Sequence, residues 1–336
     1  MQGMVDELAA KILRDVAETK SLPDEKDVVM AFKRFQAFAH QLLNEKVTPP
    51  KGDTTGSDGS AVSALLSSVN KKQASSRISK EDVIRNISTI SDRIVDAPSI
   101  FITADILKAY ISLQSLLGQP QRFPHVLRLY REKPVPRASS SAPYLELSEQ
   151  NPSSPSTAIP PDIADAALQG AIKLHDLRLA ISIIDETYCT TSYARNKTLR
   201  SALFPFAGAV LTPLAAYSLA SRFALLQNTM DNSQATGVAT AGIMTYVAAV
   251  GTIGYVALTT ANDQMRRVTW AQGMPLWQRW VREEERAAVD RVAQAWGLSS
   301  QDRWGDEEGK DWDELREWIG LRGMILDKVE LMEGME

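Results

Sequence analysis

The sequence predicts an all-α protein: a helical bundle or a degenerate helical-repeat region, then a two-helix transmembrane hairpin and an amphipathic C-terminal helical tail. Three observations favour this fold class. Apolar residues recur at three-to-four spacing along most of the chain, and almost no stretch alternates with the period of a strand. Residues 232–262 contain no charge, which is typical of a membrane span.

Composition limits the classes of protein to consider. The net charge of -4 is uneven, about +2 over residues 1–200, zero over 201–262 and about -6 over 263–336. The single cysteine, Cys189, excludes an intramolecular disulfide and a Cys-based zinc site, and it favours a reducing compartment.

Residues 1–48 are expected to form two amphipathic helices on either side of a break at Ser21–Asp24. The first twenty residues match neither a secretory signal nor an Arg-rich, acid-poor transit peptide. Residues 49–79 are rich in Gly, Ser, Thr, Asp and Lys, so we expect a flexible linker there.

Residues 80–200 are expected to form a domain of helical hairpins with a Pro/Ser-rich insert at 133–161. The segments ADILKAYISLQSLLGQPQRFPHVLRLYRE and PDIADAALQGAIKLHDLRLAISIIDETY each predict two helices, with turns at Gly-Gln-Pro and at His175-Asp176-Leu177. These units resemble degenerate tetratricopeptide or pentatricopeptide repeats, although a strict period is missing. An ordinary helical bundle is the alternative.

Residues 201–262 predict a transmembrane hairpin. A hydrocarbon core of about 30 Å needs roughly 20 helical residues, and 201–221 and 237–261 are both uncharged and long enough. Pro205 and Pro213 are expected to kink the first span. Lys and Arg flank the outer ends of both spans, so the termini are expected on the same, non-translocated side.

Small residues at every fourth position of each span predict the face along which the two helices pack in lipid. These residues are Gly208, Thr212, Ala216 and Ala220 in the first span, and Gly237, Ala241, Thr245 and Ala249 in the second.

All seven tryptophans lie in the tail, residues 263–336. Trp270, Trp277 and Trp280 come soon after the second span, and we expect them to anchor the chain at the membrane interface. Two amphipathic helices should follow, the second with Asp311 as N-cap and apolar spacing that continues to Val329. Packing of these helices into a small domain is the alternative role for the tryptophans.

No motif for catalysis, cofactor binding or metal binding is found. The acidic residues between Asp302 and Asp313 lack the EF-hand pattern, and His40, His125 and His175 belong to no metal-ligand motif. We therefore expect no enzyme, no cofactor and no small-molecule substrate. A basic set near the first helical hairpin is a possible RNA or partner contact: Arg122, Arg128, Arg131, Lys133 and Arg137.

The two spans, followed by MPLWQRWVREEERAAVDRVAQAWG and LREWIGLRGMILDKVELMEGM, resemble fungal mitochondrial inner-membrane proteins of poorly assigned function. This resemblance implies an inner-membrane anchor with both termini in the matrix; otherwise, another internal membrane with cytosolic termini is expected. The expected function is a non-enzymatic, membrane-anchored adaptor or assembly factor that contacts lipid and an unidentified protein. The alternatives are a membrane-tethered RNA-binding factor in mitochondrial gene expression, and a soluble helical scaffold with a buried apolar hairpin.

Overall fold

The computed structural model describes residues 25–44, 80–98, 100–138, 145–260 and 265–327. Within these ranges the protein is mostly helical, as the sequence predicts, with two short antiparallel strand pairs. The expected first helix and the expected linker at 49–79 lie outside the described residues. The chain divides into two compact units, and Leu174 is the last residue of the first.

The first unit is a bundle of helices: α2 (Glu25–Asn44), residues 80–96, α4 (Ala104–Leu117), the short η1 (Pro120–Arg122), α5 (Phe123–Glu132) and α6 (Pro161–Leu174). α4 contacts α2, α5 and α6. Its Tyr110 ring makes edge-to-face contacts with Phe32 at 6.2 Å and Phe123 at 6.4 Å between centroids. These three buried rings form the centre of the bundle's core.

The predicted turn between α4 and α5 is confirmed. The Thr103 side chain caps the start of α4 by accepting a hydrogen bond from the Ile106 N–H at 3.4 Å. α4 ends where Gly118 adopts a left-handed φ of 69°, a conformation that glycine accepts without a Cβ penalty. The chain then re-enters helix through η1, so the Gly-Gln-Pro segment separates the two helices as expected.

The Pro/Ser-rich insert contains a strand pair that the sequence did not predict. β1 (Val135–Ala138) pairs antiparallel with β2 (Leu145–Ser148), with Val135 opposite Ser148. Each strand has four residues, which is too short to give a clear period-two pattern.

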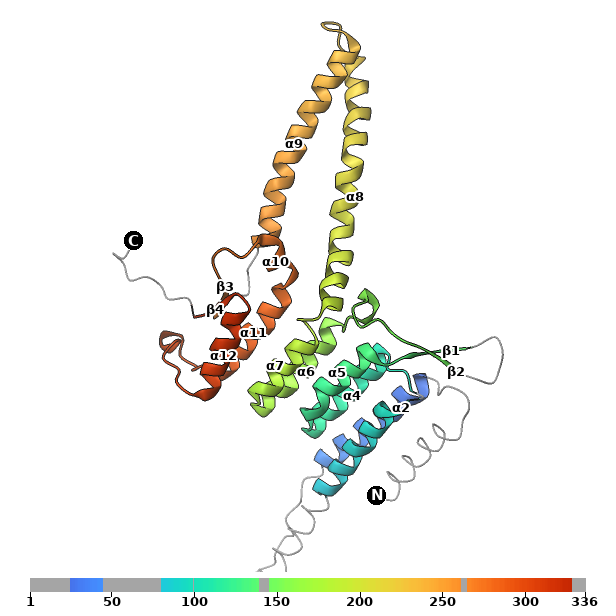
Figure 1. The fold of residues 1–336 in the computed structure, drawn as a ribbon, viewed down its shortest axis with the longest axis vertical. Helices are drawn as coiled ribbons and strands as arrows, with labels where there is room; N and C mark the ends of the chain where they lie inside the picture. Colours follow the sequence, from blue (N-terminus) through green and yellow to red (C-terminus); the bar gives the residue numbers. More distant parts are fainter. Residues whose placement is uncertain (1–24, 45–79, 99, 139–144, 261–264, 328–336) are drawn as a thin grey trace, which may run out of the picture. The chain divides into compact units, whose positions relative to one another are not determined.

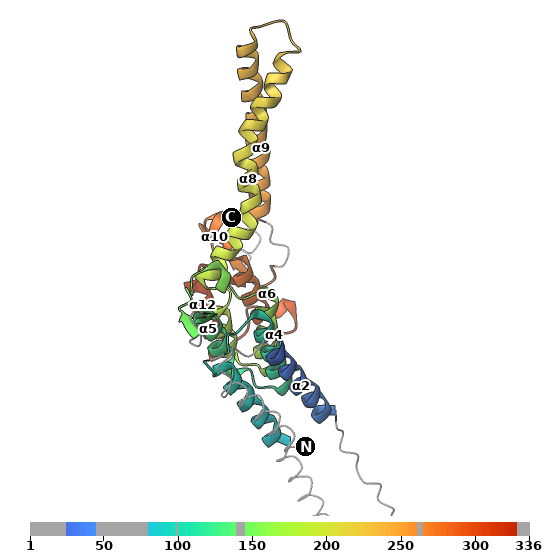
Figure 2. The ribbon, with the colours of Figure 1, turned by 90° about the vertical axis from the view of Figure 1, so that its right-hand side faces the viewer.

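The second unit contains η2 (Pro155–Thr157), α7 (Leu177–Glu186), α8 (Thr191–Ala224), α9 (Asn232–Thr260) and the tail. The tail comprises β3 (Val268–Trp270), α10 (Leu276–Val281), α11 (Glu283–Trp296), η3 (Gln301–Arg303), α12 (Lys310–Leu321) and β4 (Met324–Leu326). α8 and α9 lie side by side in both views and are joined by a short loop (Figures 1 and 2). Neither Pro205 nor Pro213 ends α8, which is one helix of 34 residues.

The second predicted helical hairpin is divided between the two units. α6 belongs to the first unit and packs on α4, whereas α7 belongs to the second and packs on α11. The expected single domain over 80–200 is therefore not one compact unit. The turn itself lies where it was predicted, with His175 at a left-handed φ of 57° and Asp176 accepting from the Leu179 N–H at 3.0 Å.

The tail has a core between α11 and α12, formed by Val289, Val292, Trp312, Leu315 and Ile319, all buried. β3 pairs antiparallel with β4, with Val268 opposite Leu326. The predicted second tail helix is shorter than expected, and Asp311 lies inside α12 rather than at its cap, which is Gly309. α12 stops at Leu321 because Gly323 turns with a φ of 73° and the chain enters β4.

Candidate membrane-contact surface

The α8–α9 pair (residues 191–260) has an unusually apolar and exposed surface. Of the large apolar side chains in α9, Tyr246 is 71% and Ile253 70% exposed, and the leucines and the single valine of α8 that are exposed range from 50 to 69%. Soluble monomers rarely leave a continuous apolar surface of this extent in water. The exposed set is Leu199, Leu203, Val210, Leu211, Leu214, Tyr217, Leu219, Phe223, Leu225, Leu226, Met230, Val238, Tyr246, Val247, Val250, Ile253, Tyr255, Val256 and Leu258.

Among the described residues, α9 alone is long and apolar enough to cross a membrane. It has 29 residues, a mean hydropathy of 1.6 in its most apolar window, and none of that window is buried. At about 1.5 Å per residue it is longer than the roughly 30 Å hydrocarbon core. α8 is less apolar than α9, so the structure supports one of the two spans of the predicted transmembrane hairpin.

The threonine hydroxyl groups of α9 are satisfied within the helix. Each of its six threonines donates a hydrogen bond to the carbonyl four residues earlier; Thr245 bonds Ala241 and Thr252 bonds Ala248, both at 2.8 Å. In α8, the Thr212 hydroxyl donates to the Gly208 carbonyl at 2.7 Å in the same way. A donor that is already bonded loses less on transfer from water to lipid. These threonine hydrogen bonds depend on side-chain rotamers, so the sequence does not predict them.

The small residues of α8 and α9 do not all lie at the helix contact. Ala216 and Ala220 of α8 are buried and Thr212 is partly buried, but Gly208 is exposed. In α9 the whole predicted set, Gly237, Ala241, Thr245 and Ala249, is exposed. A Cβ at Gly208 or Gly237 would meet no atom within 4 Å, so neither glycine permits a close approach of backbones.

α9 instead contacts α8 through a face that begins at Ala235, which is buried, and continues through Ala239 and Ile243, which are partly buried. This face is two residues out of step with the predicted one. At 100° per residue, a shift of two residues turns the helix by about 200°, so the predicted residues point away from α8.

The tryptophans expected at the interface have different surroundings. Trp270 is 7% exposed, and its Nε1–H donates to Glu283 at 3.1 Å, so it belongs to the tail's interior. Trp277 on α10 is 44% exposed, and Trp280 is partly buried. Both residues belong to α10, which contacts α8 and α9 and lies at the end of the pair away from the connecting loop (Figure 1). We call this end the base of the pair.

The centre of the tail is the buried Arg267 side chain. Its Nε and Nη2 donate to the two carboxylate oxygens of Asp327 at 2.8 and 2.6 Å, and Nη2 lies 2.8 Å from Glu307 Oε1. Its guanidinium carbon lies 4.9 Å from the ring centroid of Trp304 and 4.6 Å from that of Trp312. Arg267, which lies a few residues after α9, is therefore bound to three later parts of the tail: Glu307, Asp327 and the rings of Trp304 and Trp312.

Gly297 leaves the space that Arg267 needs. A Cβ at Gly297 would lie 1.6 Å from Arg267 Nη1 and 2.9 Å from the Ala293 carbonyl oxygen. Asp290 also holds the start of β3. Its Oδ1 accepts hydrogen bonds from the backbone N–H groups of Arg267 and Val268, each at 2.8 Å.

A second polar cluster connects α7 with α11 and the end of α12. Arg322 Nη1 lies 3.2 Å from both Cys189 Sγ and Glu285 Oε1, and its Nη2 pairs with Asp185. Burial, together with the Glu285 charge, raises the pKa of the Cys189 thiol. A raised pKa disfavours the thiolate, which is the nucleophilic form of cysteine.

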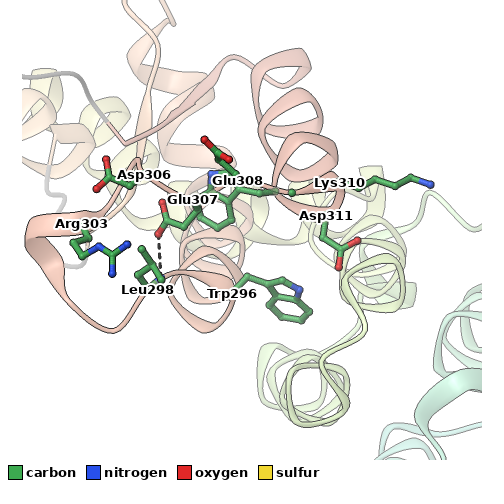
Figure 3. A pocket seen from close by; sticks show the side chains of 10 residues that line it. Trp296, Leu298, Arg303, Asp306, Glu307, Glu308, Lys310 and Asp311 are labelled. Carbon is green, nitrogen blue, oxygen red and sulfur yellow. Dashed lines mark hydrogen bonds between the residues drawn. The ribbon is translucent and has the colours of Figure 1, made fainter.

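A pocket of about 550 Å³ opens between the end of α11 and the start of α12 (Figure 3). Asp306, Glu308 and Asp311 surround it, with Trp296 and Trp312 in its wall. In the part of the chain that the structure describes, no group of His, Cys, Asp and Glu could hold a metal ion. The pocket's central carboxylate, Glu307, is already bound to Arg267 and to the Leu298 N–H at 3.0 Å.

Glu307 gives the tail a defined pH dependence. Burial alone would raise its pKa, but the N–H donors of Leu298 and Gly305 and the Arg267 charge outweigh burial and hold that pKa below its usual range. A carboxyl whose pKa is lower in the folded than in the unfolded state stabilises the fold above its unfolded value of 4.5, and this stability is lost as pH falls through the folded pKa.

Glu307→Gln should therefore lower the free energy of unfolding of the tail by about 1–3 kcal/mol at pH 7, and by less as the pH falls below 4.5. Denaturant titration of the full chain in detergent, followed by tryptophan fluorescence, measures this, because all seven tryptophans lie in the tail. Glu308→Gln, at an exposed neighbour, is the control with little effect. A destabilisation by Glu307→Gln that does not change with pH would contradict the assignment.

The basic set near α5 is not a surface of free cations. Arg122 pairs with Asp92 at 3.3 Å and Asp96 at 2.9 Å. Lys133 is buried, and its Nζ donates to the carbonyls of Val95 and Ala97 at 2.7 and 2.6 Å, at the end of the helix 80–96. Burial lowers the Lys133 pKa to about 8. Arg128 and Arg131 also have partners, and the Arg137 side chain is outside the described residues.

No protein-family model, no curated protein and no solved structure matches this chain. The structure alone therefore defines the class: a mostly helical protein with one candidate membrane-spanning helix and a folded, tryptophan-rich tail directly after it.

Proposed function

We propose that this protein is a non-enzymatic, membrane-anchored adaptor in which the α8–α9 pair lies in lipid and the helical parts on either side bind other proteins. The observation that carries the proposal is the uncharged apolar surface of α9, which has no buried residue in its most apolar window and is exposed over most of its length. Since nothing in the described residues covers that surface, a lipid environment accounts for it better than a buried hairpin in a soluble scaffold.

α8 is proposed to return through the same membrane as a less apolar second span. Residues 201–221 carry no charge, and 24 residues from 201 to 224 extend about 36 Å at 1.5 Å per residue, enough to cross the hydrocarbon core. Arg222 lies near the loop, where its long side chain can reach the headgroups. Both flanks of the pair then lie on one side of the membrane.

An assembly factor of the mitochondrial inner membrane, with both termini in the matrix, is the particular role we propose. The resemblance of the spans and tail to fungal inner-membrane proteins supports it, as do the cations at both outer ends of the pair. The RNA-binding alternative has less support, because Arg122 and Lys133 are engaged in internal contacts.

Alkaline carbonate extraction of membranes from cells that express the full chain tests the anchor. The wild-type chain should stay in the membrane pellet, whereas Val250→Arg with Ile253→Arg should move a large part of it to the supernatant. Each arginine at a span centre costs about 2.5–3.5 kcal/mol, and both positions are exposed, so no protein packing is lost.

Leu321→Arg is the matched control, since Leu321 is 82% exposed on α12 and lies outside the spans. It should remain in the pellet. Release of the wild-type chain, or equal retention of the double variant, would contradict the proposal. Protection of tags at both termini in mitochondria stripped of the outer membrane tests the orientation, and digestion of either tag would overturn it.

A further inference from the structure

The base of the α8–α9 pair joins exposed tryptophan to cations that pair with no carboxylate of the described residues. We propose that this base, formed by α10 and the Lys197–Arg200 turn of α8, binds the headgroups of anionic lipids and holds the tail against the membrane surface. This inference rests on the proposed membrane anchor, and it adds the class of lipid and the residues that bind it.

Direct contacts fix α10 at the level where α8 leaves its uncharged segment. Lys197 Nζ donates to the Trp280 carbonyl and pairs with Glu284, and α10 also contacts α9. Arg200 follows Lys197 by about one helical turn and is the last charge before the uncharged residues 201–221. Arg200 and α10 therefore lie where a membrane around the pair would end.

The aromatic side chains of α10 suit such an interface. None of the six residues of α10 is buried, and the rings of Trp277 and Trp280 lie 4.9 Å apart between centroids. In water, an exposed tryptophan adds little to the stability of such a short helix. At the headgroup level its rings contact acyl chains while the indole N–H groups remain hydrated.

The cations at the base are available to an external anion. Arg200 is exposed, and Arg279 donates to the neutral carbonyls of Met274 and Ala271 at 3.0 and 3.3 Å. No carboxylate pairs with either one among the residues that the structure describes. Both guanidinium groups therefore keep a net positive charge that a lipid phosphate can neutralise.

Charge changes sign abruptly after the base. On the side of the base, residues 187–221 and 263–282 together carry seven Lys and Arg against one Asp, whereas residues 283–336 carry 16 Asp and Glu against seven Lys and Arg. An anionic surface attracts the first group and repels the second. This polarity favours one orientation, with α10 on the lipid and the acidic part of the tail directed away from it.

Quenching of tail tryptophans by brominated lipid tests the inference. The full chain is reconstituted in phosphatidylcholine vesicles containing 20% phosphatidylglycerol, with bromine on either the phosphatidylglycerol or an equal amount of phosphatidylcholine. Brominated phosphatidylglycerol should quench at least twofold more than brominated phosphatidylcholine. Trp277→Phe should remove most of the quenching in both cases, since Trp277 is the exposed ring at the base.

The preference for anionic lipid should fall to about onefold in Arg200→Gln with Arg279→Gln, and also when salt is raised from about 0.05 to 0.5 M. Arg316→Gln, which removes an exposed charge from α12, should leave the preference unchanged.

Equal quenching by the two brominated lipids, with the chain retained after alkaline washing, would overturn this inference and leave the anchor intact. A chain that alkaline washing removes from the vesicles would overturn both.

Discussion

Arg267→Met is expected to destabilise the tail by about 3–5 kcal/mol, a large fraction of the stability of a small domain. Methionine occupies a similar volume but leaves Asp327 and Glu307 without their shared cation. It also removes the guanidinium from the rings of Trp304 and Trp312. Denaturant titration by tryptophan fluorescence in detergent should show a much lower midpoint.

Arg266→Met is the matched control for this substitution. The neighbouring Arg266 is exposed, and its side chain donates a 3.3 Å hydrogen bond to Gln294, so a loss below about 1 kcal/mol is expected. Adding Glu307→Gln and Asp327→Asn to Arg267→Met should recover part of the lost stability, because these changes remove the uncompensated carboxylates. Equal effects of the two single substitutions would contradict the central place of Arg267.

Gly297→Ala should destabilise the same tail by at least 2–3 kcal/mol, because the new methyl group has no room. The guanidinium of Arg267 would have to move away from a Cβ at 1.6 Å, and the Ala293 carbonyl at 2.9 Å belongs to the backbone and cannot turn aside. The backbone of Gly297 itself is not strained, with φ -74° and ψ 166°, so the cost is steric. The same unfolding curves measure it.

Gly320→Ala is expected to have the opposite effect and to stabilise the same domain. Gly320 lies in α12 with no atom within 4 Å of an added Cβ, so alanine should stabilise the helix by up to about 1 kcal/mol. A neutral Gly297→Ala would show that Arg267 does not occupy this position in solution.

The helical part of the fold follows from local pattern. Apolar spacing predicted α2, α4 and α5, and Gly118 with Pro120 marked the end of α4, since these signals act within one or two turns of chain. The tail was less predictable. The Arg267–Asp327 pair and the β3–β4 pairing join residues 60 and about 56 positions apart, and no local pattern reports such contacts.

The sequence predicts where the apolar segment of the candidate membrane surface lies, but not which face of α9 contacts α8. Absence of charge located α9, because this signal belongs to the whole segment and does not depend on which face packs. Small residues occur on several faces of α9, so spacing alone selected Gly237 and Ala241 although Ala235 begins the contact. The sequence predicts the same interfacial role for Trp270 and Trp277 because they lie close together in the chain. Nearness in sequence does not distinguish the buried Trp270 ring from the exposed Trp277 ring.

Cysteine labelling in sealed membranes tests the central claim, that the α8–α9 pair crosses the bilayer and returns, most directly. Single cysteines replace Asn228 in the loop, Tyr246 in α9 or Ser299 in the tail, in a chain whose Cys189 is serine; all three positions are exposed. An impermeant maleimide should label either the loop cysteine at 228 or the tail cysteine at 299, but not both. After the membranes are permeabilised it should label both. The cysteine in Tyr246→Cys should react only after denaturation. Labelling of all three from one side would contradict a membrane-spanning pair.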